Sequence, residues 1–277
     1  GELSLALWSV LQRHHPANGF PATDVAQAYA AWYDSMPFDI GRTCSMAFEY
    51  AQDEVEKGWN DATSLKRLME FVTSVSSGSQ ANGAMMRVSP VAVWHAIHYS
   101  ETREPITIAE CAALAAAQDA RLSHPNQVVR DANAVYVYAL TLLLLGQTPQ
   151  QAFDHVETLI RERCHETVEE WLDEAKRDEL PHAFAPNIGH VRYAFVAALW
   201  FLQRPEITFE EALKQVLLKG GDTDTNAAIV GAMVACYQPI PQRMIDAVYG
   251  YDCLIKERRP AAYGVMYQLP PFNRSST

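Results

Sequence analysis

The sequence predicts an all-α fold, a compact bundle of many helices, and three observations support this prediction. Apolar side chains recur at helical steps, as in the stripe of Leu3, Leu7, Val10 and Leu11, and such steps place them on one face of a helix. No stretch alternates convincingly between apolar and polar residues with a period of two, the pattern of a half-buried strand. Residues typical of helix starts and ends also separate the apolar runs.

Capping residues predict where the helices begin and end. In a capping box, a Ser or Thr and a Glu or Gln three residues later bond each other's backbone amides at a helix start, and glycine is common just past a helix end. The capping boxes are Thr107 with Glu110, Thr148 with Gln151, and Thr208 with Glu211; the glycine ends are Gly58, Gly146, and Gly220 with Gly221. We therefore predict about thirteen helices, near 2–13, 23–33, 42–57, 63–75, 84–98, 108–122, 126–145, 149–163, 166–177, 189–203, 209–219, 225–237 and 241–248.

Length and composition indicate one globular domain over 1–277. The chain has 277 residues, of which 49% are hydrophobic, enough to bury a large core. Lys and Arg number 22 against 33 Asp and Glu, a net charge of −11, so the protein's field repels phosphate backbones and anionic lipids. We therefore expect neither nucleic acid nor a membrane as a partner.

The cysteines and the longest apolar run indicate a cytoplasmic protein. The five cysteines are widely spaced, without a CxxC pair, as is typical of reduced thiols in the cytosol. The apolar run 134–145 is shorter than the roughly 20 residues of a membrane span, and no leader-like segment opens the chain. No feature of the sequence specifies an oligomer, and we expect the protein to be a monomer.

The segment Gly220–Asn226, of sequence GGDTDTN, is the strongest candidate for a metal site. Asp222 and Asp224 repel each other at the start of a predicted helix, whose amino end offsets only about 0.3–1 kcal/mol per charge. A divalent cation would offset much more, and oxygen donors favour Mg²⁺, Mn²⁺ or Ca²⁺ over Zn²⁺. Equally compatible with the sequence is a simpler role, in which Asp222 or Thr223 caps the helix.

A second candidate site is the small-residue loop 76–83, which opens into a predicted helix. Backbone N–H groups and hydroxyls in such a loop can bind a phosphate without lysine. Most loops of this composition are plain turns, however, and that alternative stays open.

Two further polar residues lie at predicted helix junctions. His124, in the sequence SHP, is placed either to hydrogen-bond a ligand hydroxyl or to cap a helix. Asp39, in the sequence PFDIGRT, either faces a cleft or caps the helix predicted to begin near Arg42.

Five segments together resemble the ADP-ribosylglycohydrolase family, and the resemblance spans nearly the whole chain. In chain order they are PFDIGRT, GSQANGAMMRVSP, SHP, NIGHVRYAFVAALW and GGDTDTNAAIVGAM. The segment PFDIG is similar to the bacterial branch that removes ADP-ribose from dinitrogenase reductase.

The resemblance implies an all-α hydrolase that uses two Mg²⁺ or Mn²⁺ ions to cleave ADP-ribose from a modified protein side chain, with arginine as the expected linkage. It implies that Asp222, Asp224 and Thr225 bind metal, that Asp224 and Asp39 take part in catalysis with Asp39 near the substrate arginine, and that Gly78, Ser79, Gln80, Ala81, Asn82, Gly83 and His124 bind ADP-ribose.

One part of the family pattern is not matched. The family's other metal ligands lie in a T-D-D segment just before a helix that resembles Glu2–Leu7, and an earlier Glu belongs to the same centre. We therefore expect an amino-terminal segment ahead of Gly1.

Three alternatives to the hydrolase remain open. The chain could bind ADP-ribose without hydrolysing it, or act as an immunity protein that neutralises an ADP-ribosyltransferase toxin, or be a structural helical module. Serine and nucleic-acid linkages are not excluded by the sequence.

Overall fold

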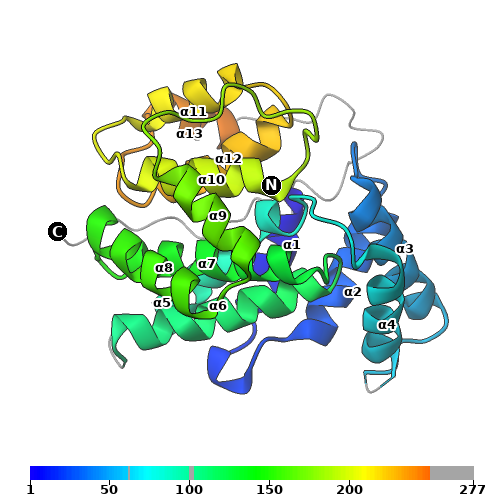
Figure 1. Cartoon of the computed structure of the whole chain (residues 1–277). Helices are drawn as coiled ribbons and strands as arrows, with labels where there is room; N and C mark the ends of the chain where they lie inside the picture. Colours follow the sequence, from blue (N-terminus) through cyan, green and yellow to red (C-terminus); the bar gives the residue numbers. More distant parts are fainter. Residues whose placement is uncertain (62, 100–102, 250–277) are drawn as a thin grey trace.

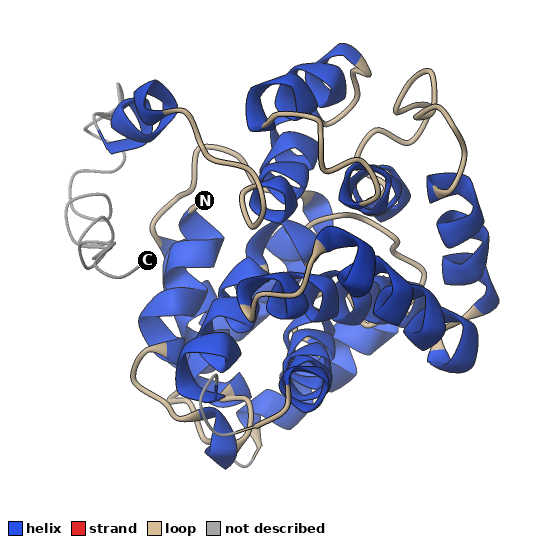
Figure 2. Cartoon of the chain, turned by 90° about the vertical axis from the view of Figure 1, so that its left-hand side faces the viewer, coloured by secondary structure: helices blue, strands red, loops and turns tan. Residues whose placement is uncertain are grey.

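The computed structural model describes residues 1–61, 63–99 and 103–249, and in these residues the fold is all-α, as predicted (Figures 1 and 2). Every predicted helix has a counterpart. The α-helices are α1 Glu2–Leu11, α2 Ala22–Asp34, α3 Arg42–Glu56, α4 Ser64–Ser76, α5 Ser89–Tyr99, α6 Pro105–Arg121, α7 Gln127–Leu144, α8 Pro149–Arg163, α9 Glu166–Ala175, α10 Val191–Leu202, α11 Phe209–Leu218, α12 Thr223–Val234 and α13 Gln242–Tyr249, with short 3₁₀ turns η1 Pro16–Asn18 and η2 Met85–Arg87.

Helix α7 lies at the centre of the bundle and is buried along most of its length. Helices α5, α6, α8 and α10 pack against it, while α2, α3 and α4 form one flank and α10, α11 and α12 another (Figure 1). Small residues on α6, such as Ala109, Ala112 and Ala116, are buried and let the axes of α6 and α7 approach closely. Among the described residues, no helix is both long and apolar enough to cross a bilayer.

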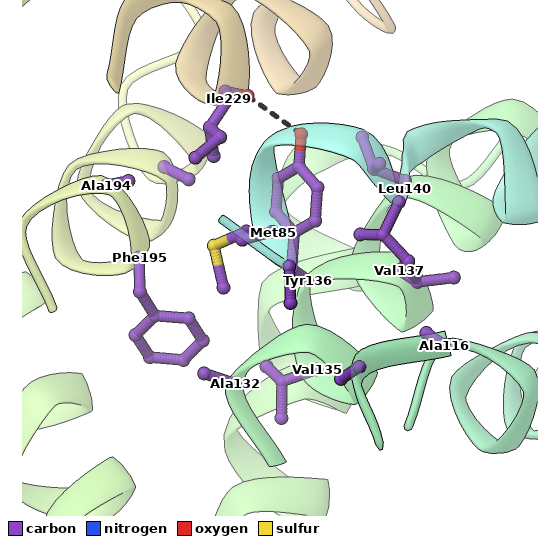
Figure 3. Close-up of a cluster of buried hydrophobic side chains, with 14 of the residues drawn as sticks. Met85, Ala116, Ala132, Val135, Tyr136, Val137, Leu140, Ala194, Phe195 and Ile229 are labelled. Atoms are coloured by element: carbon purple, nitrogen blue, oxygen red, sulfur yellow. Dashed lines mark hydrogen bonds between the residues drawn. The ribbon is translucent and has the colours of Figure 1, made fainter. Parts of the chain in front are cut away.

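The side chain of Tyr136 joins α7 to α12 through the core. Its hydroxyl donates a 2.8 Å hydrogen bond to the carbonyl oxygen of Ile229, and both residues lie among buried apolar side chains that include Met85 and Phe195 (Figure 3). The metal candidates Asp222 and Asp224 lie at the start of the same helix α12, so this contact holds their helix against the centre of the bundle.

The boundary predictions are mostly confirmed. Thr148 and Gln151 form the predicted capping box, and Thr208 accepts the predicted bond from the amide of Glu211. The glycine ends all have positive φ: Gly58 +87°, Gly146 +87°, Gly220 +71° and Gly221 +74°.

Two boundary predictions are wrong, and proline explains both. Thr107 does not cap a helix, because α6 begins at Pro105, where proline's fixed φ suits the first helical position. The helix predicted over 84–98 is instead a 3₁₀ turn followed by α5, since Pro90 has no N–H to continue the helical hydrogen bonds.

We predict that Tyr136→Phe lowers the free energy of unfolding by about 1 kcal/mol, the usual net value of a buried hydrogen bond. Chemical denaturation measures this change. The matched control is Tyr50→Phe, because Tyr50 stacks on Phe71 and its hydroxyl has no hydrogen-bond partner in the described part of the chain. Equal losses in the two variants would contradict the prediction.

Candidate active site

One cavity of about 560 Å³ brings together most of the residues predicted as a site. Its volume lies within the usual range of pockets for small organic ligands. It is lined by the start of α1, by segment 38–44, which comprises the loop before α3 and the first turn of α3, by loop 81–83 and by the first turn of α12. The predicted residues in its lining are Asp39, Ala81, Asn82, Gly83, His124, Asp222, Asp224 and Thr225. Gly78, Ser79 and Gln80 are not in this lining.

The double glycine before α12 sets the position of Asp222. Both glycines have a positive φ, and a Cβ on Gly221 would lie 2.5 Å from the carbonyl oxygen of Phe184. Asp222 is the N-cap residue of α12, but its side chain makes no capping hydrogen bond. Instead, Oδ2 accepts a 2.8 Å hydrogen bond from Nδ2 of Asn82. The capping alternative is therefore not favoured, because this carboxylate is turned toward the loop 81–83.

The two carboxylates of this turn interact electrostatically. Burial raises the pKa of Asp222, the nearby Asp224 carboxyl raises it further, and hydrogen bonds with Asn82 and Thr225 act in the opposite direction. Asp222 is half-buried, whereas Asp224 is exposed. The raised pKa is the expected result of two acids that share a partly desolvated site.

The donor atoms of this turn fit a hard cation, since they are two carboxylates and the hydroxyl of Thr225. In the described ranges, no group of three or more His, Cys, Asp or Glu side chains is arranged to hold a metal ion. By themselves, these three residues would make only part of an oxygen ligand set, and their binding of a metal stays a prediction. Gly1 and Glu2 line the same cavity.

The loop 78–83 is held by the segment before α10. The amide of Asn82 donates to the carbonyl of Gly189, and the amide of Val191 donates to the carbonyl of Gln80, both at 2.9 Å. On the other side, the hydroxyls of Ser79 and Thr43 lie 2.9 Å apart. Gln80 and Ser79 thus support the loop from outside the cavity, and their binding of a diphosphate stays a prediction.

A buried charged cluster lies directly beneath this loop, and the sequence analysis missed it. Arg87 is fully buried; its Nε donates to Oδ2 of Asp119 at 3.0 Å and its Nη2 to the Asp119 carbonyl, also at 3.0 Å. Its Nη1 donates to Oγ of Ser123 at 2.9 Å and to the carbonyl of Gly83 at 3.4 Å. The available signal was a lone acid, Asp119, on the alanine-rich face of a buried helix, since buried acids almost always have a partner.

His124 is fully buried in the cavity wall. Its Nδ1 lies 2.8 Å from Oγ of Ser123, and its Nε2 has no hydrogen-bond partner in the described structure. Burial, with a smaller contribution from the charge of Arg87, lowers the pKa of His124 to about 3, so the ring is neutral at pH 7. Asn126, not His124, caps α7. The capping role considered from the sequence is therefore not observed, and contact of His124 with a ligand stays a prediction.

Asp39 lies at the exposed rim of the cavity and does not cap α3. The N-cap of α3 is Gly41, with no side-chain capping bond. The neighbouring Phe38 is 79% exposed, so this rim presents an acidic and an aromatic side chain together. Elsewhere in the lining, Nε1 of Trp32 donates a 2.7 Å hydrogen bond to the carboxylate of Glu2. The sequence analysis predicted neither of these two lining residues.

We predict that Gly221→Ala destabilises the protein more than Gly220→Ala. Both substitutions strain a positive φ, which costs roughly 1–2 kcal/mol, but only Gly221 would also place a Cβ against the Phe184 carbonyl, whereas a Cβ on Gly220 meets nothing within 4 Å. Urea titration of both variants measures the difference. If the two unfolding free energies coincide, the close approach at Gly221 is not a constraint on the turn.

Comparisons with known proteins identify the family that this chain is similar to. The ADP-ribosylglycohydrolase family model matches residues 1–268. A putative ADP-ribosyl glycohydrolase of Acanthamoeba polyphaga mimivirus is 26% identical over 271 residues, with 93% of this chain and 75% of that protein covered. The ADP-ribosyl-[dinitrogen reductase] glycohydrolase of Rhodospirillum rubrum is 26% identical over 259 residues, with 91% and 68% covered.

A solved structure described as an ADP-ribosylglycohydrolase-related protein complex has the same fold, with a TM-score of 0.64 at 22% identity, covering 88% of this chain and 73% of that one. The family resemblance and the all-α fold predicted from the sequence are thus confirmed.

Proposed function

We propose, because the chain belongs to the ADP-ribosylglycohydrolase family, that it releases ADP-ribose from arginine side chains of modified proteins. Family membership makes it a hydrolase of ADP-ribose linkages, and the arginine linkage is the finer part of the proposal. The observation that carries it is the convergence of Asp39, Asp222, Asp224, loop 81–83 and His124 on one cavity.

Asp222, Asp224 and Thr225 are the residues that would hold Mg²⁺ or Mn²⁺ in a two-ion centre. When bound, such ions would orient ribose hydroxyls and activate a water. Asn82 orients Asp222 by its 2.8 Å hydrogen bond.

In the proposed reaction, water adds across the bond between the anomeric carbon and a guanidine nitrogen. The carbon gains the hydroxyl and the nitrogen gains the proton, so arginine leaves as a guanidinium. Positive charge that develops on the ribose is stabilised by nearby carboxylates. The carboxylate of Asp39, at the rim, would accept hydrogen bonds from the guanidinium and orient it. His124, neutral and buried, would contact an oxygen of ADP-ribose.

We predict that Asp222→Asn and Asp224→Asn each abolish Mg²⁺-dependent release of ADP-ribose from an arginine-modified protein. Loss of a direct ligand should weaken metal binding by more than the roughly 10–100-fold typical of an outer-shell partner. Calorimetric titration with Mg²⁺ and a release assay test this, with the exposed Asp53→Asn on α3 as the control. Unchanged Mg²⁺ affinity and release in both variants would overturn the metal assignment.

Metal-independent binding of ADP-ribose without release in the parent protein would instead favour a non-hydrolysing binder.

We predict that Asp39→Asn lowers kcat/KM for arginine-linked ADP-ribose by about tenfold, which corresponds to about 1.4 kcal/mol, because the carboxylate's charge faces the guanidinium. Affinity for free ADP-ribose, which has no guanidinium, should not change. The control is Asp34→Asn, which lies at the exposed end of α2 outside the cavity lining. Equal loss of affinity for free ADP-ribose, or faster release from serine-linked substrates in the parent protein, would contradict the role of Asp39.

A further inference from the structure

The hydrogen bonds around Ser123 determine which nitrogen of His124 carries the proton. Oγ of Ser123 lies 2.9 Å from Nη1 of Arg87 and 2.8 Å from Nδ1 of His124. A guanidinium can only donate hydrogen bonds, so the serine oxygen is the acceptor in the first contact. The serine proton must then go elsewhere, and among the described residues the remaining acceptor in contact with this oxygen is Nδ1 of His124.

It follows that Nδ1 of His124 accepts and that Nε2 carries the ring proton. With the opposite tautomer, Nδ1–H would donate to the serine oxygen, and the hydroxyl proton of Ser123 would be buried without an acceptor among the described residues. The Nε2–H group has no hydrogen-bond partner in the part of the chain that the structure describes, and its side chain is fully buried in the wall of the cavity.

Arg87 has little freedom to release Ser123. The carboxylate of Asp119 accepts from its Nε, and the other oxygen of that carboxylate is held by the hydroxyl of Tyr29 at 2.7 Å. The guanidinium carbon also lies 4.5 Å from the ring centre of Tyr29 and 5.4 Å from that of Phe48.

The ring of His124 is likewise confined by the backbone beside it. A Cβ built on Gly83 would lie 3.0 Å from Cε1 of His124 and 2.9 Å from Sγ of Cys44. The absence of a side chain at this position lets the loop backbone pack against the imidazole edge.

We propose that Asp119, Arg87 and Ser123 act as positioning residues that fix His124 as the Nε2–H tautomer, a permanent hydrogen-bond donor to a ligand oxygen. The acceptor class is a diphosphate or ribose oxygen, and this part rests on the proposed function. His124 is then neither a general base nor a metal ligand, because Nδ1 is already engaged and Nε2 is already protonated.

The tautomer can be measured without any ligand. In the full chain labelled with ¹⁵N-histidine, NMR at pH 7 should show Nδ1 of His124 as an unprotonated nitrogen and Nε2 as a protonated one, with the resonance assigned by its loss in His124→Gln. Ser123→Ala should shift both nitrogens toward a mixture of tautomers, because the hydroxyl that donates to Nδ1 is gone. A protonated Nδ1 in the parent protein would overturn the proposal, as would an unchanged spectrum in Ser123→Ala.

Binding of ADP-ribose tests the ligand part. Calorimetry should show about a tenfold weaker affinity in Ser123→Ala, while the matched control Ser64→Ala should keep both the affinity and the His124 spectrum. Ser64 is also buried and also accepts from an arginine, Arg67, at 3.1 Å, but it lies outside the cavity. Unchanged affinity in folded Ser123→Ala would overturn the positioning role. Failure of the parent protein to bind ADP-ribose would overturn the proposed function and the ligand class, while the tautomer is decided by NMR alone.

Discussion

The arrangement of the cavity depends on the buried ion pair between Arg87 and Asp119. Both side chains are fully buried, and taking two charges out of water costs several kcal/mol per ion, which their attraction and further hydrogen bonds must offset. Here all three guanidinium nitrogens donate, to a carboxylate, to two backbone carbonyls and to the hydroxyl of Ser123. Removing one partner would leave an uncompensated charge, at a cost of about 3–5 kcal/mol. Because Arg87 also donates to the carbonyl of Gly83, the ion pair ties loop 81–83 to the core.

The same geometry explains why residues far apart in the chain meet at one place. Asn82 donates to Asp222 across 140 residues, and Tyr136 donates to Ile229 across 93, so the start of α12 is held by the loop and its middle by α7. The segment 187–191 joins them, since it holds the loop through backbone hydrogen bonds while α10, which follows it, packs on α12. The distance between the carboxylates and the loop is thus set by helix packing.

Much of the fold could be predicted from the sequence because its signals are local. Helical spacing, the Thr148 capping box and the glycine ends each depend on a few neighbouring residues, and all were confirmed. The helix start predicted at Thr107 was wrong, because α6 begins two residues earlier at Pro105, which was the stronger signal. For the site, the GGDTDTN pattern located two carboxylates, but the roles of Arg87 and Asp119 could not be derived, because their pairing joins residues 32 apart in sequence that only the fold brings together.

Burial divides the charges of this region into two groups with different consequences. Arg87 and Asp119 neutralise each other in the core, so they add rigidity but no net charge to the cavity. Asp39 and Asp224 are exposed, and Asp222 is half-buried and hydrogen-bonded by a neutral amide, so the cavity keeps an excess of negative charge. Such a surface attracts cations, and a divalent ion and an arginine guanidinium are both of that kind. In the proposed role, the neutral His124 in the same cavity would offer an oxygen-rich ligand a hydrogen-bond donor that adds no charge.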